Sequence, residues 1–255
     1  MKHYLVEGKT LPEAYHKAIE KLDTEGKVYP CADYNTTMKE CSLSFHVEDA
    51  IAEPFISKLF CGGHHELQQY EMEIVDGVLD FMTEAEGDEY WEYTYHERFA
   101  HQLEFIKEEL KRNPYTRRAT MNIRDFDIDT SNEHPACLQS IGLYNRDGKL
   151  HMKATMRSND AVQATFMNAV GFIALLRNLA QELELQVGSY THTAYSFHAY
   201  ESSFDTLKDY AEKIRTKDIG DLTYDYEGYY KDMMLEEIPS IMKQVEILRE
   251  KHAKK

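Results

Sequence analysis

The longest apolar helical segment, residues 161–184, is the feature that most strongly constrains the fold of this chain. In its first half, AVQATFMNAVGFIALL, apolar residues occur nearly all round the helix, which is typical of a helix enclosed by other elements. One amide side chain, Asn168, interrupts this apolar half, and a buried amide needs a hydrogen-bond partner. The segment therefore predicts a domain built around a buried helix.

Alternation of apolar and polar residues predicts β-strands on both sides of this helix in the sequence. These strands are expected at 41–47, 119–123, 137–144, 149–156 and 187–200, with a hairpin turn at 145–148. Helical spacing predicts further helices at 10–24, 66–82, 95–111 and from 221 onward, and an acidic loop is expected at 84–92. Neither a linker nor an internal repeat divides the chain. We therefore expect one α+β domain over residues 1–255, with a mixed β-sheet packed against the long buried helix.

The charge balance limits the partners of the chain. Its 45 Asp and Glu against 29 Lys and Arg give a formal net charge of −16, which repels a nucleic-acid backbone and argues against binding of a duplex. The aromatic content of 12% argues against a disordered chain. A small anionic substrate stays compatible with this charge, because it needs only a local cationic pocket.

The same sequence predicts a cytoplasmic protein. Its first residues contain no apolar segment followed by a cleavage signal, and no stretch approaches the ~18–20 apolar residues of a membrane span. Four cysteines without a leader favour free thiols in a reducing compartment.

Several residues are candidates for chemistry. Arg117-Arg118 precede one predicted strand and Arg157-Ser158 end another, and arginine can bind phosphate with two parallel hydrogen bonds. Cys137 stands at the entry to a strand, where nearby arginines would lower the pKa of the thiol and make it a nucleophile. The alternatives are ordinary surface arginines and a small buried cysteine.

Two further polar residues lie on one face of the buried helix and its entry. Asp160 and Asn168 are eight residues apart, which is about 2.2 helical turns. Metal ligands are less well represented. Cys61, His64 and His65 are close in sequence, but no second pair follows at zinc-finger spacing, and we expect no bound metal.

Taken in order, these motifs resemble thymidylate synthase. The double arginine, then HPACLQ (134–139), MRSNDAVQATFMN (156–168) and AYSFH (194–198) follow the order of that family's motifs. The likeness covers roughly residues 93–200 and is greatest for the short branch of the family found in archaea and anaerobes. The resemblance implies a thymidylate synthase-like fold in which one sheet face forms a homodimer.

The resemblance also implies a role for each candidate residue. Cys137 would add to carbon 6 of the pyrimidine, with Tyr95 near it and Glu71 as the general base, for which Glu73 is the alternative. Arg157 and Ser158 would hold the nucleotide phosphate. The remaining implied roles are phosphate binding across the dimer interface by Arg117 and Arg118, recognition of the base by Asn168, of the ribose by Tyr195 and of the reduced folate by Asp160.

The co-substrate implied by the resemblance is 5,10-methylene-tetrahydrofolate or a methanopterin analogue. An amide at position 168 can donate to the carbonyl oxygen of uracil and accept from its ring N–H, which favours deoxyuridine monophosphate (dUMP) over cytosine nucleotides. Thymidylate would then be the product.

Departures from the family pattern leave two alternatives open. Trp91 is the only tryptophan, where the family has a pair in its folate pocket, and the last residues, HAKK, are not the apolar tail that closes over the site. A site open to water would favour hydroxymethylation of dUMP, dCMP or CMP through the same intermediate. The more remote alternative is a nucleotide-binding regulator that has lost the reaction.

Overall fold

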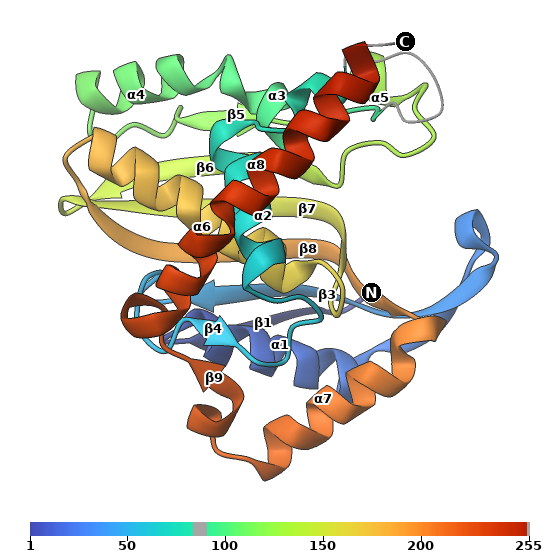
Figure 1. The fold of residues 1–255 in the computed structure, drawn as a ribbon. Helices are drawn as coiled ribbons and strands as arrows, with labels where there is room; N and C mark the ends of the chain where they lie inside the picture. The colour runs from blue at the N-terminus through green and yellow to red at the C-terminus, as the bar shows by residue number, and fades with distance from the viewer. Residues whose placement is uncertain (84–90, 254–255) are drawn as a thin grey trace.

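The computed structural model describes residues 1–83 and 91–253, and within them the chain forms a seven-stranded sheet and a two-stranded ribbon (Figure 1). The large sheet has the order β1-β3-β8-β7-β6-β5, with β2 paired to β3. The strands are β1 (His3–Gly8), β2 (Lys27–Cys31), β3 (Thr36–Val47), β4 (Ile56–Ser57), β5 (Thr120–Asn122), β6 (Leu138–Arg146), β7 (Lys149–Asp160), β8 (Gln186–Tyr200) and β9 (Thr223–Tyr224). Because β1–β3 and β7–β8 are parallel while the other pairs are antiparallel, the sheet is mixed, as predicted.

Helices cover this sheet in successive layers. They are α1 (Leu11–Glu25), α2 (His64–Asp76), α3 (Tyr95–Ala100), α4 (Leu103–Arg112), α5 (Phe126–Asp129), α6 (Thr165–Glu182), α7 (Phe204–Thr216) and α8 (Lys231–Ala253). The helix α6 packs on β7 and β8, α2 packs on α6, and α8 crosses over α2 in Figure 1. The helix that the sequence predicts to be buried is therefore enclosed between the sheet and α2.

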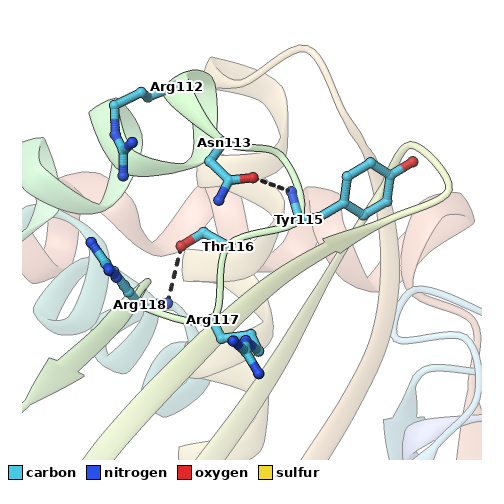
Figure 2. Close-up of a pocket in the computed structure, with 6 residues that line it drawn as sticks. All are labelled: Arg112, Asn113, Tyr115, Thr116, Arg117 and Arg118. Atoms are coloured by element: carbon cyan, nitrogen blue, oxygen red, sulfur yellow. Dashed lines mark hydrogen bonds between the residues drawn. The ribbon is translucent and has the colours of Figure 1, made fainter.

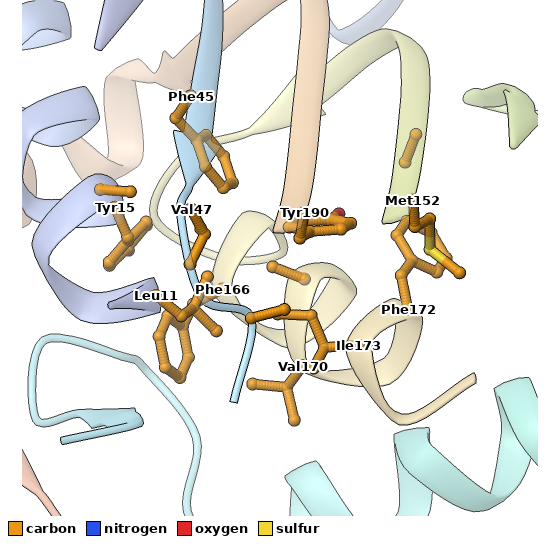
Figure 3. Close-up of a cluster of buried hydrophobic side chains, with 14 of the residues drawn as sticks. Leu11, Tyr15, Phe45, Val47, Met152, Phe166, Val170, Phe172, Ile173 and Tyr190 are labelled. Carbon is orange, nitrogen blue, oxygen red and sulfur yellow. The ribbon is translucent and has the colours of Figure 1, made fainter. Parts of the chain in front are cut away.

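The hydrophobic core lies where α6 meets the sheet (Figure 3). Phe166 and Phe172 of α6 contribute large rings to it, together with Phe45 of β3, Tyr190 of β8 and Tyr15 of α1, and each of these side chains is at most 1% exposed. Burial of a side chain of this size stabilises the fold by about 1.5–3 kcal/mol relative to leaving it in water. This core holds α6 in one position against β7 and β8.

Two predicted helices differ from the sequence pattern, one by ending earlier and one by dividing in two. The helix predicted over 66–82 stops as α2 at Gly77, whose φ of 63° ends the helix in the left-handed region. The helix predicted over 95–111 divides into α3 and α4. At the break, the Gln102 amide donates to the backbone carbonyl of Asn122 in β5 at 2.7 Å and accepts from its N–H at 3.0 Å, so a tertiary contact decides the break.

The other predicted elements agree with the structure in their position, except that the helix expected from residue 221 onward begins at Lys231 as α8, after the short strand β9. Helix α1 begins after Thr10, whose hydroxyl accepts from the N–H of Glu13 as an N-cap. The hairpin β6–β7 turns at 147–148, and β7 continues beyond its predicted end to Asp160. The sequence analysis missed β1, β2, β4, β9, α5 and α7. None of the described helices is long and apolar enough to cross a membrane, and most of the acidic loop expected at 84–92 and the last two residues lie outside the described chain.

Strand register brings the candidate residues together. Cys137 immediately precedes β6, and the N–H of Arg157 in β7 donates to the carbonyl oxygen of Cys137 at 2.8 Å. In the parallel pair β7–β8, Ser158 lies beside Ser196 and Asp160 beside His198. Residues twenty or more positions apart in the chain therefore meet at one end of three adjacent strands.

Candidate active site

Arg157 fixes the segment that carries Cys137. Its Nη2 donates to the carbonyl oxygen of Pro135 at 2.7 Å and its Nε to that of Ala136 at 3.2 Å. Since its backbone N–H also bonds the carbonyl of Cys137, three hydrogen bonds from one residue hold the approach to the thiol. Charged donors make hydrogen bonds about twice as strong as neutral ones, so this arginine positions the nucleophile.

The environment of Cys137 corrects the expectation of a lowered pKa. Burial raises the pKa of this thiol above its ordinary value, and the opposing attraction of Arg157 and Arg124 does not outweigh burial. All four cysteines of the chain are free, as expected. The thiol is therefore largely protonated at neutral pH in the structure without a bound nucleotide.

Three tyrosines surround this thiol. They are Tyr70 of α2, Tyr93 and Tyr95. Burial raises the pKa of each phenol, and a thiolate at Cys137 would raise it further. The rings of Tyr93 and Tyr95 lie 5.7 Å apart at an angle of 28°. A cavity of about 140 Å³ opens beside them, lined by Tyr70, Glu73, Ile74, Trp91, Tyr93, Thr94 and Tyr95. The structure thus places Tyr95 beside Cys137, where it was expected.

Asn168 finds its hydrogen-bond partner in α2. The hydroxyl of Tyr70 donates to the Oδ1 of Asn168 at 2.5 Å, and the amide itself is only 5% exposed. Its Nδ2 has no hydrogen-bond partner among residues 1–83 and 91–253. Within this part of the chain the amide therefore keeps an unused donor.

A second polar group lies at the ends of β7 and β8. The Oγ of Ser158 lies 3.5 Å from Nδ1 of His198, whose ring meets Tyr200 edge-on at a centroid distance of 4.8 Å. The Nε2 of His198 is buried without a hydrogen-bond partner in the described part of the chain. Because an unpaired buried nitrogen destabilises a fold by about 1–3 kcal/mol, this atom is suited to meet a ligand.

Asp160 combines a structural contact through one oxygen with a second oxygen that accepts no hydrogen bond from the described residues. Its Oδ1 accepts from the N–H groups of Val162 and Gln163, both at 2.9 Å, and so shapes the turn that leads into α6. Its charge reaches Tyr200, which places it beside the His198 group. Tyr195, in contrast, is 55% exposed on β8, and the structure does not bring it into this group.

The two glutamates of α2 differ in what they face. Glu71, expected as the general base, is paired with a cation. Its carboxylate accepts from Arg177 of α6 at 3.0 and 3.2 Å, although burial still raises the pKa of this carboxyl. Glu73 lines the tyrosine cavity, accepts from the Gln69 amide at 2.8 Å, and has its pKa raised by burial. The reason is helical geometry, since residues two apart lie on different faces.

Arg117 and Arg118 lie away from this cluster, in the loop between α4 and β5. With Arg112, Asn113, Tyr115 and Thr116 they line a hollow of about 640 Å³ that includes none of the other candidate residues (Figure 2). Both arginines are exposed. In the view of Figure 2, Arg112 and Arg118 extend to one side of the loop and Arg117 to the other. This surface is a cationic patch on an otherwise acidic protein.

The described residues contain no group of three or more His, Cys, Asp or Glu side chains that could hold a metal ion. His64 and His65, considered above as metal ligands, both contact the carboxylate of Glu237 in α8, at 3.0 and 2.8 Å. They therefore join α2 to α8.

Sequence reasoning missed three residues of this site. Tyr70 could have been found because it lies three positions before Glu73 and so shares its helical face. His198 and Tyr200 occur in the segment already singled out, but an alternating strand pattern alone does not tell which of its polar residues meet Ser158. That assignment required the β7–β8 register.

Comparison with known proteins defines the family. A family model described as thymidylate synthase matches residues 63–238, which is more than half of the chain. The chain belongs to the thymidylate synthase family.

Individual relatives agree with this assignment. The chain is 28% identical to a "Putative thymidylate synthase" of Methanocaldococcus jannaschii over 79% of its own length and 93% of that protein. It is 32% identical to a thymidylate synthase of Bacillus subtilis subsp. natto over 42% of its own length and 38% of that protein. Among solved structures, thermostable thymidylate synthase A from Bacillus subtilis shares the fold, with a TM-score of 0.61 at 17% identity over 80% of this chain and 84% of that one.

Proposed function

We propose that this protein transfers a one-carbon unit from methylene-tetrahydrofolate, or a related pterin, to carbon 5 of dUMP and produces thymidylate. The observation that carries the proposal is the placement of Cys137. Its backbone is held by Arg157, and its thiol lies beside the phenols that include the partner of Asn168. A nucleophile, a cation and a base-reading amide are thereby brought together by the fold of this family.

In this proposal the nucleotide lies across the ends of β7 and β8. Arg157 uses Nε and Nη2 on backbone carbonyls, which leaves its Nη1 for the phosphate, with Ser158 as a second donor. The unpaired Nε2 of His198 meets the ribose together with Tyr200, in place of Tyr195. The free oxygen of Asp160 contacts the reduced folate.

The proposed reaction begins with the sulfur of Cys137. The thiol gives up its proton to a base as its sulfur forms a bond to carbon 6, and the electron pair of the C5–C6 double bond moves to carbon 5, which attacks the methylene carbon of the folate. A base removes the proton from carbon 5 while the folate nitrogen leaves. Hydride transfer from the folate then gives the methyl group and dihydrofolate, and the sulfur departs as the C5–C6 double bond forms again.

Glu73 is the residue of α2 that we propose as the general base. It lines the cavity beside Tyr70 and Tyr95, and its pKa is raised toward neutrality because the carboxyl is buried. A general base works best when its pKa approaches the working pH. We assign Glu71 a structural role, because its ion pair with Arg177 links α2 to α6.

Hydroxymethylation of dUMP, dCMP or CMP is the alternative that the cavity itself favours. Four of its lining residues carry hydroxyl groups and one carries a carboxylate, and its single tryptophan, Trp91, is 40% exposed. Such walls can hold water near the exocyclic methylene, and water added there in place of hydride gives a hydroxymethyl group.

Assembly and location complete the proposal. The positions of β7 and β8 that alternate with the core positions, among them Lys153, Thr155 and Thr191, are partly or fully exposed. This face fits a homodimer in which Arg117 and Arg118 reach the partner's phosphate site. We propose that residues 1–255 act as one domain, in the cytoplasm.

The test is the formation of a covalent complex. The protein is incubated with 5-fluoro-dUMP and methylene-tetrahydrofolate, with a tetrahydromethanopterin arm in parallel, and its intact mass is measured. We expect an adduct that the Cys137→Ala variant does not form. The lack of an adduct on both proteins in both arms would leave the nucleotide-binding regulator as the better description. Mass analysis of products from dUMP, dCMP and CMP separates methyl from hydroxymethyl transfer.

A further inference from the structure

The contact between Tyr70 and Asn168 has a consequence for the choice of base. We infer that Tyr70 is a specificity-determining residue, which holds the Asn168 amide with its Nδ2 toward the nucleotide and so selects uracil over cytosine. The inference rests on the proposed function, because it concerns the base that this site receives.

The geometry fixes one orientation of the amide. The Tyr70 hydroxyl donates to Oδ1 of Asn168 at 2.5 Å, and the described residues provide no second hydrogen-bond partner for that hydroxyl. Turning the amide by 180° would place its N–H2 group against the phenol. The phenolic O–H would then lose its only acceptor in a buried setting, where the pKa of this phenol is raised far above its ordinary value.

The position of the Tyr70 ring is itself set by α6. Gly171 lies three residues after Asn168 on the same helix face, and a Cβ at Gly171 would lie 2.8 Å from Cδ1 of Tyr70. Only a residue without a side chain lets the ring approach α6 this closely. The same Cβ would also lie 3.1 Å from Cγ1 of Ile74, one turn further along α2.

A fixed Nδ2 donor distinguishes the two bases at position 4. Uracil presents a carbonyl oxygen there, which accepts from the amide, whereas cytosine presents an amino group, which also donates. Cytosine could pair with Asn168 only after the amide turned and broke its bond to Tyr70. We expect this coupling to contribute about tenfold to the preference for dUMP, which corresponds to about 1.4 kcal/mol.

The experiment measures the dissociation constants of dUMP and dCMP by calorimetry for the wild type, Tyr70→Phe and Gly171→Ala. Tyr70→Phe removes only the hydroxyl, and Gly171→Ala displaces the ring while keeping the hydroxyl. The control is Tyr210→Phe, which removes a phenol that is 8% exposed and belongs to α7. We expect the ratio of the two constants to fall about tenfold in both test variants and to stay unchanged in the control.

The outcomes separate this inference from the proposed function. A wild type that binds dUMP selectively and forms the Cys137 adduct, with a ratio unchanged by both test variants, would overturn the role of Tyr70 alone. Selective binding of dCMP by the wild type would overturn the assigned amide orientation while one-carbon transfer stands. Binding of neither nucleotide, with no adduct, would overturn both. Circular dichroism melting of each variant verifies that the compared proteins are folded.

Discussion

Two buried histidines make the stability of this protein sensitive to acid. His192 is fully buried, with Nδ1 2.7 Å from the Tyr190 hydroxyl, Nε2 2.8 Å from Oδ1 of Asn159, and its ring stacked on Phe45. Burial lowers the pKa of His192 from 6.5 to about 3. His16 donates or accepts at 2.8 Å with Ser57, and burial lowers its pKa to about 4.

The sign and size of the effect follow from these values. Both histidines stay neutral in the folded protein between pH 6.5 and 4, while the unfolded chain binds a proton at each. Stability present above pH 6.5 is therefore lost as the pH falls from 6.5 toward the folded pKa values. Between pH 7 and pH 5 the linkage relation gives a loss of about 2 kcal/mol for each histidine, or about 4 kcal/mol together.

The assay is urea unfolding at pH 7 and pH 5. In His192→Gln, the amide can still pair with Tyr190 and Asn159 but does not titrate, so the loss on acidification should be about 2 kcal/mol smaller than in the wild type. His101→Gln, at an exposed position, is the matched control and should behave as the wild type. Subtracting the loss of unfolding free energy in the variant from that in the wild type cancels the contribution of the carboxyl groups, because these titrate in every protein compared. An equal loss on acidification in His192→Gln and the wild type would refute the reasoning.

Three further predictions concern the site and its scaffold. Arg157→Ala should raise the pKa of Cys137 further and slow its alkylation by iodoacetamide at pH 8 by about two- to fivefold. An unchanged alkylation rate would show that Arg157 does not lower the pKa of this thiol. Glu73→Gln should slow turnover of dUMP, which requires loss of the carbon 5 proton, by about 10²-fold or more, whereas Glu71→Gln should mainly lower the melting temperature. The reverse pattern would restore Glu71 as the base. Gly77 has a φ of 63°, and a Cβ there would collide with His96. Gly77→Ala should therefore lower the free energy of unfolding by about 1–3 kcal/mol. A smaller loss, measured by urea unfolding, would show that an alanine is not strained at this position.

Part of the candidate site could be predicted because it is local in the sequence. Arg157, Ser158 and Asp160 follow one another on a single strand, and Asn168 stands out as an amide in an apolar helix, so their types and spacing were readable at once. Glu71 and Tyr195 show the limit of that approach. Each lies in the expected element, but the direction of its side chain depends on helix phase and on strand register, which are set by packing against α6 and β7.

The fold follows the same division. The buried helix, the N-cap at Thr10 and the hairpin at 147–148 depend on apolar periodicity and on local backbone chemistry, which are written in consecutive residues. The break between α3 and α4 depends on the bond between Gln102 and Asn122, twenty residues away. No pattern in neighbouring residues predicts such a contact.

The sequence by itself determined that this acidic chain would bury a helix carrying one amide and would place Arg157 near the end of a strand. Hydrophobic periodicity and residue chemistry suffice for those conclusions, because both act over a few consecutive positions. Only the tertiary structure decided that Arg157 is bonded to the backbone before Cys137, and that Tyr70 is the partner of Asn168. These contacts join elements separated by about 20 to 100 residues, so they exist only once the sheet register and the α2–α6 packing are formed.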